Sequence, residues 1–175
     1  MGNNIDGAFD AYNKAKQRFY EEHDAFVSLC KEKGENTVVL SQDAGVYIAL
    51  KETISWAVAL YDRTNKKNFS KQEISFMSGI KFIDNTIKHT KAVFDIYAIL
   101  HPGVTITLDA EDSNEGPKLN GVELKPCLVW GKLDNIPVVK KYENQRQNYF
   151  VYVGKLGVVE SIMKMDTIIR NNCMI

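Results

Sequence analysis

Three polar residues near the middle of the chain could perform acid–base chemistry, namely Asn85, Lys88 and His89. Asn85 and His89 are four residues apart, so on a helix their side chains lie on one face, one turn from each other. A neutral imidazole can act as a general acid or base near pH 7, and an amide and an ammonium group can hold a phosphate beside it. The spacing predicts a catalytic site with these three residues. The structural alternative is that His89 is a hydrogen-bonded histidine at a helix–helix interface.

A second candidate site is the basic cluster of Arg63, Lys66 and Lys67, in a loop between two predicted helices. Such a cluster can bind phosphate, although most are solvated loop tips. The acidic segment 109–115 lacks the ligand spacing of a calcium loop, and the three cysteines are far apart without a CxxC pair. We therefore expect no metal site and no cofactor.

The segment 70–100 is expected to position the first candidate site. It contains no proline and a single glycine, and its apolar residues form two stripes with the spacing of a helix. Ser70 and Glu73 have the spacing of a capping box at its start. Two apolar stripes indicate that other elements pack on the helix from two sides, so we expect one unbroken, covered central helix.

The remaining segments predict three more helices and a small sheet. Helices are expected over 4–33 and from about 41 to 65, and the second has an apolar surface broad enough for a bundle or a subunit interface. After the sequence HPGV the apolar period changes towards two, and Asn120-Gly121 is a strong hairpin signal. Pro126 predicts an edge strand or a bulge, and a second hairpin is expected over 137–153.

These elements predict an α+β fold in a single compact domain. Residues 1–103 form an antiparallel helical bundle in this interpretation, and residues 104–154 form a small antiparallel sheet inserted after the third helix. Residues 155–175 form a C-terminal helix that packs back on the bundle.

The composition is that of a soluble globular protein. The chain has 175 residues, of which 45% are hydrophobic and 25% charged. Lys plus Arg number 22 and Asp plus Glu also 22, so no overall field attracts nucleic acid or an anionic membrane. The sequence shows neither a signal peptide nor an apolar run long enough for a bilayer. We expect a cytoplasmic protein.

The segment from Asp84 to His89 resembles the signature of the HEPN superfamily of helical-bundle proteins, many of them ribonucleases of toxin–antitoxin and phage-defence systems. Asn85 and His89 match the family's spacing, whereas Asp84 occupies the position of the motif arginine. The resemblance implies a helical bundle with a cleft at a dimer axis and His89 as acid or base on RNA. Asp84 reverses the charge that would stabilise a phosphorane-like transition state, so Lys81 or Lys88 would have to replace the arginine.

Three functions follow from these patterns. The first is a non-enzymatic binding or interaction module of a bacterial or phage-like genome, forming a homodimer through its bundle and contacting a protein partner. The second is a HEPN-like ribonuclease or a degenerate relative, and the third is a small-molecule-binding protein that uses the sheet around Trp130, Tyr142, Tyr149 and Tyr152. Gln145 and Arg146 could also stack on a nucleobase, although a polar hairpin tip has the same composition.

Overall fold

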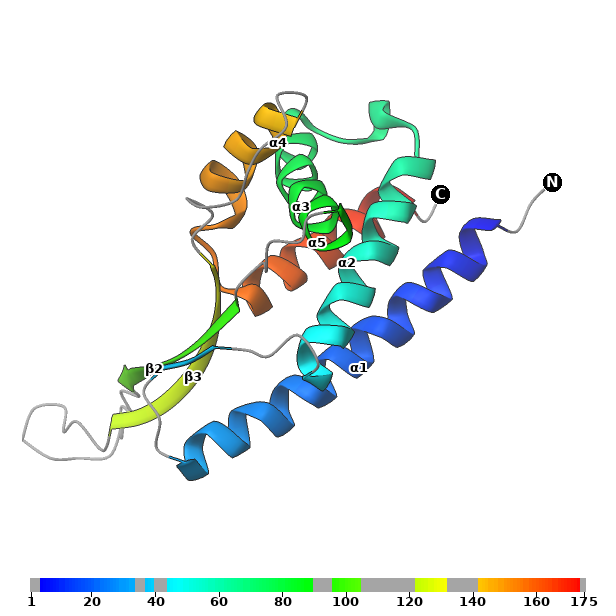
Figure 1. Cartoon of the computed structure of the whole chain (residues 1–175). Helices are drawn as coiled ribbons and strands as arrows, with labels where there is room; N and C mark the ends of the chain where they lie inside the picture. The colour runs from blue at the N-terminus through cyan, green and yellow to red at the C-terminus, as the bar shows by residue number, and fades with distance from the viewer. Residues whose placement is uncertain are drawn as a thin grey trace, which may run out of the picture.

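The computed structural model describes residues 4–33, 37–39, 44–89, 96–104, 122–131 and 142–173, and it is mostly helical (Figure 1). Two predicted features, the Asn120-Gly121 turn and the strand at 137–142, lie wholly or almost wholly outside these residues. The described elements, in chain order, are α1 (Asn4–Lys33), β1 (Thr37–Val39), α2 (Gly45–Arg63), the 3-10 turn η1 (Lys66–Asn68), α3 (Lys71–His89), β2 (Ile96–Val104), β3 (Val122–Trp130), α4 (Glu143–Asn148), the π-helical segment η3 (Tyr149–Val153) and α5 (Val158–Cys173).

The first two predicted helices are confirmed as α1 and α2, which lie side by side in Figure 1. Tyr12 and Phe19 of α1 and Leu50 and Ile54 of α2 are almost completely buried in one core. Their spacings of seven and four residues place each pair on a single helix face. Burial of this shared apolar face, more than intrinsic propensity, stabilises the two helices.

The third helix begins as predicted but is shorter than expected. The capping box is present, because the Ser70 backbone N–H donates to Glu73 Oε2 at 2.7 Å and the Glu73 N–H donates to Ser70 Oγ at 3.2 Å. However, α3 ends at His89, and Ile96–Val104 is the strand β2. The prediction of one unbroken helix over 70–100 is therefore wrong.

The sheet also differs from the predicted one. Among the described residues it has three antiparallel strands in the order β1-β2-β3, and Ile96 of β2 pairs with Trp130 of β3. The sheet thus includes residues that precede α2 and residues expected at the end of the third helix. The predicted boundary at residue 104 between the helical bundle and the sheet is therefore wrong. Pro126 lies in β3, which among the described strands is at an edge of the sheet, one of the two alternatives that the sequence predicted, and an edge strand tolerates the missing N–H of proline.

The predicted strand at 148–153 is helical. Asn148 ends α4, and Tyr149–Val153 continue as η3 against α3. Gly79 permits this approach, because a Cβ at this position would lie 2.8 Å from Val153 Cγ2 and 3.0 Å from the Tyr149 backbone. Tyr149 is buried, and its hydroxyl donates to the Gly131 carbonyl at 3.0 Å. The predicted β sub-domain over 104–154 is therefore partly helical.

The last helix, α5, has the predicted apolar face, with Val158, Ile162, Met165 and Ile169 fully buried. It contacts α2 and β3. It also contacts α1 through an ion pair in which Lys16 Nζ lies 2.6 Å from Asp166 Oδ1. Among the described residues, no helix is both long and apolar enough to cross a membrane.

Candidate functional site

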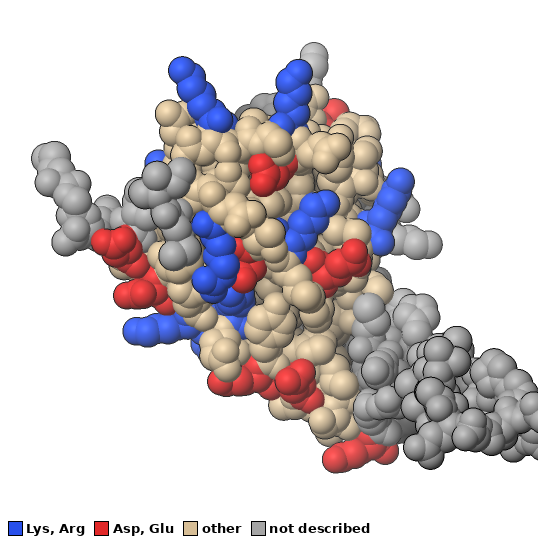
Figure 2. Space-filling view, turned by 180° about the vertical axis from the view of Figure 1, so that it is seen from behind, with Lys and Arg blue, Asp and Glu red and all other residues tan. Residues whose placement is uncertain are grey.

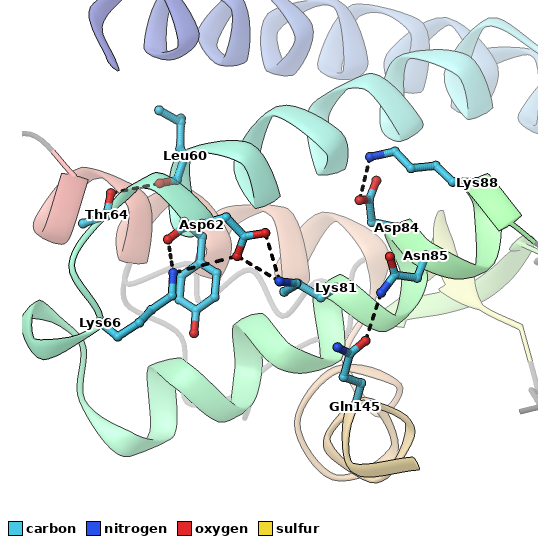
Figure 3. A network of polar contacts seen from close by, with 10 residues as sticks. Leu60, Asp62, Thr64, Lys66, Lys81, Asp84, Asn85, Lys88 and Gln145 are labelled. Carbon is cyan, nitrogen blue, oxygen red and sulfur yellow. Dashed lines mark hydrogen bonds and ion pairs between the residues drawn. The ribbon is translucent and has the colours of Figure 1, made fainter. Parts of the chain in front are cut away.

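Two of the three predicted site residues of α3, Asn85 and Lys88, belong to a strip of polar contacts between α2, α3 and α4, which we call the α3 polar strip (Figure 3). Helices α2 and α3 run antiparallel, so Ser55 of α2 meets Asp84 of α3 while Asp62 of α2 meets Lys81. The strip consists of Ser55, Asp62, Lys81, Asp84, Asn85, Lys88 and Gln145.

Asp84 is the buried centre of this strip. Its residue is only 4% exposed. Ser55 Oγ donates to Asp84 Oδ1 at 2.7 Å, and Lys88 Nζ donates to Asp84 Oδ2 at 2.7 Å. Both carboxylate oxygens therefore have a donor, which compensates for the loss of hydration on burial. Where the HEPN signature has an arginine, this chain has a carboxylate that joins α2 to α3.

Lys88 and Asn85 do not converge on one site. The Lys88 side chain reaches Asp84, one turn earlier in α3, and its ammonium group forms an ion pair there (Figure 3). Asn85 Nδ2 instead donates to Gln145 Oε1 of α4 at 3.1 Å. The amide and the ammonium group thus hold two different contacts rather than one phosphate.

The third predicted catalytic residue, His89, is the last residue of α3. The structure describes His89 through its backbone only. The spacing of four residues from Asn85 is retained within the helix, so both residues remain on one helical face. The acid–base role of His89 stays a prediction.

The basic cluster is also engaged within the chain. Lys66 Nζ donates to the Tyr61 carbonyl, lies over the Tyr61 ring at 3.4 Å from its centroid and lies 3.9 Å from Asp62 Oδ1. Partial burial lowers the pKa of the Lys66 ammonium below its usual range, with Asp62 opposing the shift. Arg63 and Lys67 are exposed, and the Lys67 backbone N–H caps onto Asn65 Oδ1. Lys66 therefore closes the C-terminal end of α2 instead of extending towards a ligand.

Some partners in the strip could be anticipated from the sequence and others could not. Asp84 with Lys88, and Asp62 with Lys66, have the i, i+4 spacing of helical ion pairs. The contact between Lys81 Nζ and both Asp62 oxygens, each at 2.9 Å, joins residues nineteen positions apart. Such a contact follows only from the packing of α2 on α3.

Three of the four aromatic residues proposed for a small-molecule site pack in or against the hydrophobic core, namely Trp130, Tyr149 and Tyr152. Trp130 is buried, and its indole Nε1 donates to Ser161 Oγ of α5 at 3.0 Å. Tyr149 and Tyr152 lie in η3 and not in a sheet, which corrects the predicted arrangement. Burial raises the pKa of the Tyr149 hydroxyl above its usual range.

The described surface carries both signs of charge. Figure 2 shows Lys and Arg side chains interspersed with Asp and Glu over an otherwise uncharged face. Within the described parts of the chain, no group of three or more histidine, cysteine or acidic side chains is arranged to hold a metal ion. Comparisons with family models, curated proteins and solved structures give no match for this chain.

Proposed function

We propose that this protein is a non-enzymatic, cytoplasmic interaction module that forms a homodimer through the exposed face of α2. The observation that supports this proposal is the pair Ile48 and Trp56, which are 37% and 38% exposed. The i, i+8 spacing belongs to one stripe of a helix. Among the described residues, α2 is the only element with two exposed large apolar side chains, because the others are single residues on α1, η3 and α5.

The charges beside this stripe favour a second copy of the chain as the partner. Glu52 lies between Ile48 and Trp56 in α2, and its Oε2 accepts from Arg18 of α1 at 3.1 Å. Both side chains of this pair are nearly half exposed, so the pair contributes little to the stability of the monomer. In a two-fold contact each copy presents the same surface, so Arg18 of one copy can face Glu52 of the other.

The α3 polar strip supports a role without catalysis. Asp84, Lys88 and Asn85 are engaged with side chains of neighbouring residues on three helices. A phosphate bound at Lys88 would lie close to the buried Asp84 carboxylate with which Lys88 pairs, and like charges at short distance are unfavourable. We therefore interpret these residues as the supports of α2 and α4, which carry the surfaces available to partners.

Sedimentation velocity over a range of protein concentrations tests the dimer. We expect Trp56→Glu to weaken self-association by about thirty-fold or more, because truncating a central interface tryptophan typically removes at least about 2 kcal/mol. Met163→Glu is the matched control, because Met163 is a single exposed apolar residue on α5, 59% exposed. This control should dimerise as the wild type does.

A charge-swap series tests the two-fold arrangement. Arg18→Glu and Glu52→Arg should each weaken the dimer, and the double variant should restore it because opposite charges face each other again. A wild-type protein that remains monomeric at about 100 μM, a concentration that reveals even a weak interface, would refute the proposal. Unchanged self-association of Trp56→Glu would refute the assignment of the interface to α2.

A further inference from the structure

The stripe of exposed residues on α2 has a different helix at each edge. At one edge, Arg18 Nη1 of α1 donates to Glu52 Oε2 at 3.1 Å, and at the other, Ser55 Oγ donates to Asp84 Oδ1 of α3 at 2.7 Å. Figure 3 shows α2 between the ribbons of α1 and α3, which both pack against it. The stripe therefore has an α1 edge and an α3 edge, and the difference between them restricts how two copies of the chain can meet.

A two-fold contact made by this stripe has two simple directions. The symmetry axis lies in the plane of the contact, so the two α2 helices run parallel if the axis follows the helix and antiparallel if it crosses the helix. The parallel arrangement places the α1 edge of one copy against the α3 edge of the other. The antiparallel arrangement places the α1 edge of one copy against the α1 edge of the other. The exposed side chains of the two edges therefore decide between these directions.

The exposed charges of the two edges favour the antiparallel arrangement. When two α1 edges meet, the Arg18–Glu52 pairs of both copies come together, and each guanidinium can contact a carboxylate of the other copy. When an α1 edge meets an α3 edge, Arg18 faces Lys88, which is the exposed member of its pair with Asp84 because their side chains are 41% and 6% exposed. Like charges oppose this contact. The exposed acid of the α3 edge, Asp62, is ten residues from Glu52, about 15 Å along α2, so it does not offset the repulsion at the level of Arg18.

The positions of the two exposed apolar side chains fit the same arrangement. Glu52 lies midway between Ile48 and Trp56, four residues from each. An antiparallel contact whose axis crosses α2 near Glu52 therefore places Ile48 of each copy opposite Trp56 of the other, and all four side chains are covered. Antiparallel helices also bring the positive end of each helix dipole towards the negative end of the other, which is favourable.

We propose that two copies of the chain meet with their α2 helices antiparallel, so that Ile48 of each copy packs on Trp56 of the other and the two Arg18–Glu52 pairs form one cluster of four charges. This inference rests on the proposed dimer and names the segment of the second copy that covers α2. Within one chain Ile48 and Trp56 are eight residues apart, about 12 Å along the helix, so they do not touch each other. A contact between them therefore reports on the dimer alone.

Isotope-filtered NMR of an equal mixture of labelled and unlabelled wild-type protein tests this contact directly. We expect intermolecular nuclear Overhauser effects between the Ile48 methyl groups of one copy and the Trp56 ring of the other. Met163, which is 59% exposed on α5, provides the control, because its methyl group should show no such effect to Trp56. Intermolecular effects from Trp56 to Trp56 or from Ile48 to Ile48, without any between the two residues, would indicate parallel helices and overturn the proposal.

Sedimentation velocity of paired charge variants tests the register independently. Adding Ile48→Lys to Trp56→Glu should raise the affinity of self-association about ten-fold above that of Trp56→Glu alone, because opposite charges at positions 48 and 56 then face each other twice in each dimer. The reversed pair, Ile48→Glu with Trp56→Lys, should show the same affinity. The matched control is Ile48→Glu with Trp56→Glu, which places like charges opposite each other and should associate no more tightly than Trp56→Glu alone.

The outcomes distinguish the register from the dimer itself. A dimer that Trp56→Glu weakens, but that neither opposite-charge pair restores, would overturn the antiparallel register and leave the assignment of the interface to α2 standing. The same conclusion would follow if the like-charge control associated as tightly as the opposite-charge pairs. A wild-type protein without self-association at about 100 μM would refute the proposed dimer, and the register with it.

Discussion

Replacing Lys88 should destabilise the protein more than replacing the buried aspartate with which it pairs. The Asp84 side chain is 6% exposed and the Lys88 side chain is 41% exposed. In Lys88→Met the carboxylate keeps only the Ser55 hydroxyl and remains buried without a cation. In Asp84→Asn the Lys88 ammonium can turn towards water, and the amide can still accept from Ser55. The two variants remove the same ion pair but leave different groups unpaired.

The magnitudes follow from this asymmetry. Breaking a fully buried pair and leaving one charge behind costs about 3 to 5 kcal/mol. Because Lys88 is partly exposed, solvent screens the pair, and we expect a smaller loss of about 2 to 3 kcal/mol for Lys88→Met. Asp84→Asn should cost about 1 kcal/mol, the value of one hydrogen bond. The double variant should also cost about 1 kcal/mol, because the amide needs no cation.

Urea denaturation monitored by circular dichroism measures these differences, provided that the slope with denaturant is unchanged among the variants. Lys67→Met is the control, since Lys67 is exposed and lies outside the α3 polar strip, and it should change the free energy of unfolding by less than about 0.5 kcal/mol. If Lys88→Met costs no more than Asp84→Asn, or if the double variant costs the sum of the two, then Asp84 does not depend on Lys88. The structural interpretation of the strip would then be wrong.

Three further predictions concern packing, pH and chemistry. Gly79→Ala should destabilise the protein by about 1 to 2 kcal/mol despite the better helix propensity of alanine, because the added Cβ meets η3. Gly7→Ala, with no atom within 4 Å of the added Cβ, should stabilise the protein by about 0.5 to 1 kcal/mol. Equal effects of the two variants in thermal denaturation would contradict the close approach of α3 and η3. Burial would raise the pKa of Asp166, but hydrogen bonds from Lys16 and Arg170 outweigh it, so the folded-state pKa is lowered. The wild type should therefore lose stability as the pH falls below about 5 towards this pKa, and Asp166→Asn should lose less over the same range in acid titrations. We expect the purified protein not to cleave RNA, and a cleavage activity that His89→Ala abolishes would instead favour the HEPN-like ribonuclease.

The helices α1, α2 and α5 could be predicted because their apolar stripes are long and are bounded by clear signals. The end of α3 could not. The residues after His89 include Val93, Phe94, Ile96 and Tyr97, which continue both helical stripes and also favour strands. Pairing of Ile96–Val104 with β3, whose paired residues lie 18 to 34 positions further along, decides between the two structures. The periodicity of one segment does not show which distant strand pairs with it.

The opposite error occurred at Asn148–Val153. The sequence NYFVYV has the composition of a strand, yet these residues complete α4 and form η3. Their structure depends on α3, where Gly79 lets the backbone of Tyr149 approach and where Ser78 Oγ accepts from Asn148 Nδ2 at 3.1 Å. The candidate site shows the same limit, since its local pair of Asp84 and Lys88 could be predicted and its contact with Gln145 could not.

Helix α3 lies between α2 on one side and α4 with η3 on the other, and it supports both. Asp84 and Lys81 hold α2 on one side, and Asn85 and Gly79 hold α4 and η3 on the other. A change at Gly79 acts on the second contact only, because its nearest neighbours are Val153 and Tyr149. Gly79→Ala should therefore loosen the packing of η3 on α3 while self-association through α2, measured by sedimentation velocity, is retained. If self-association falls together with the stability of the protein, the contacts on the two sides of α3 are not independent.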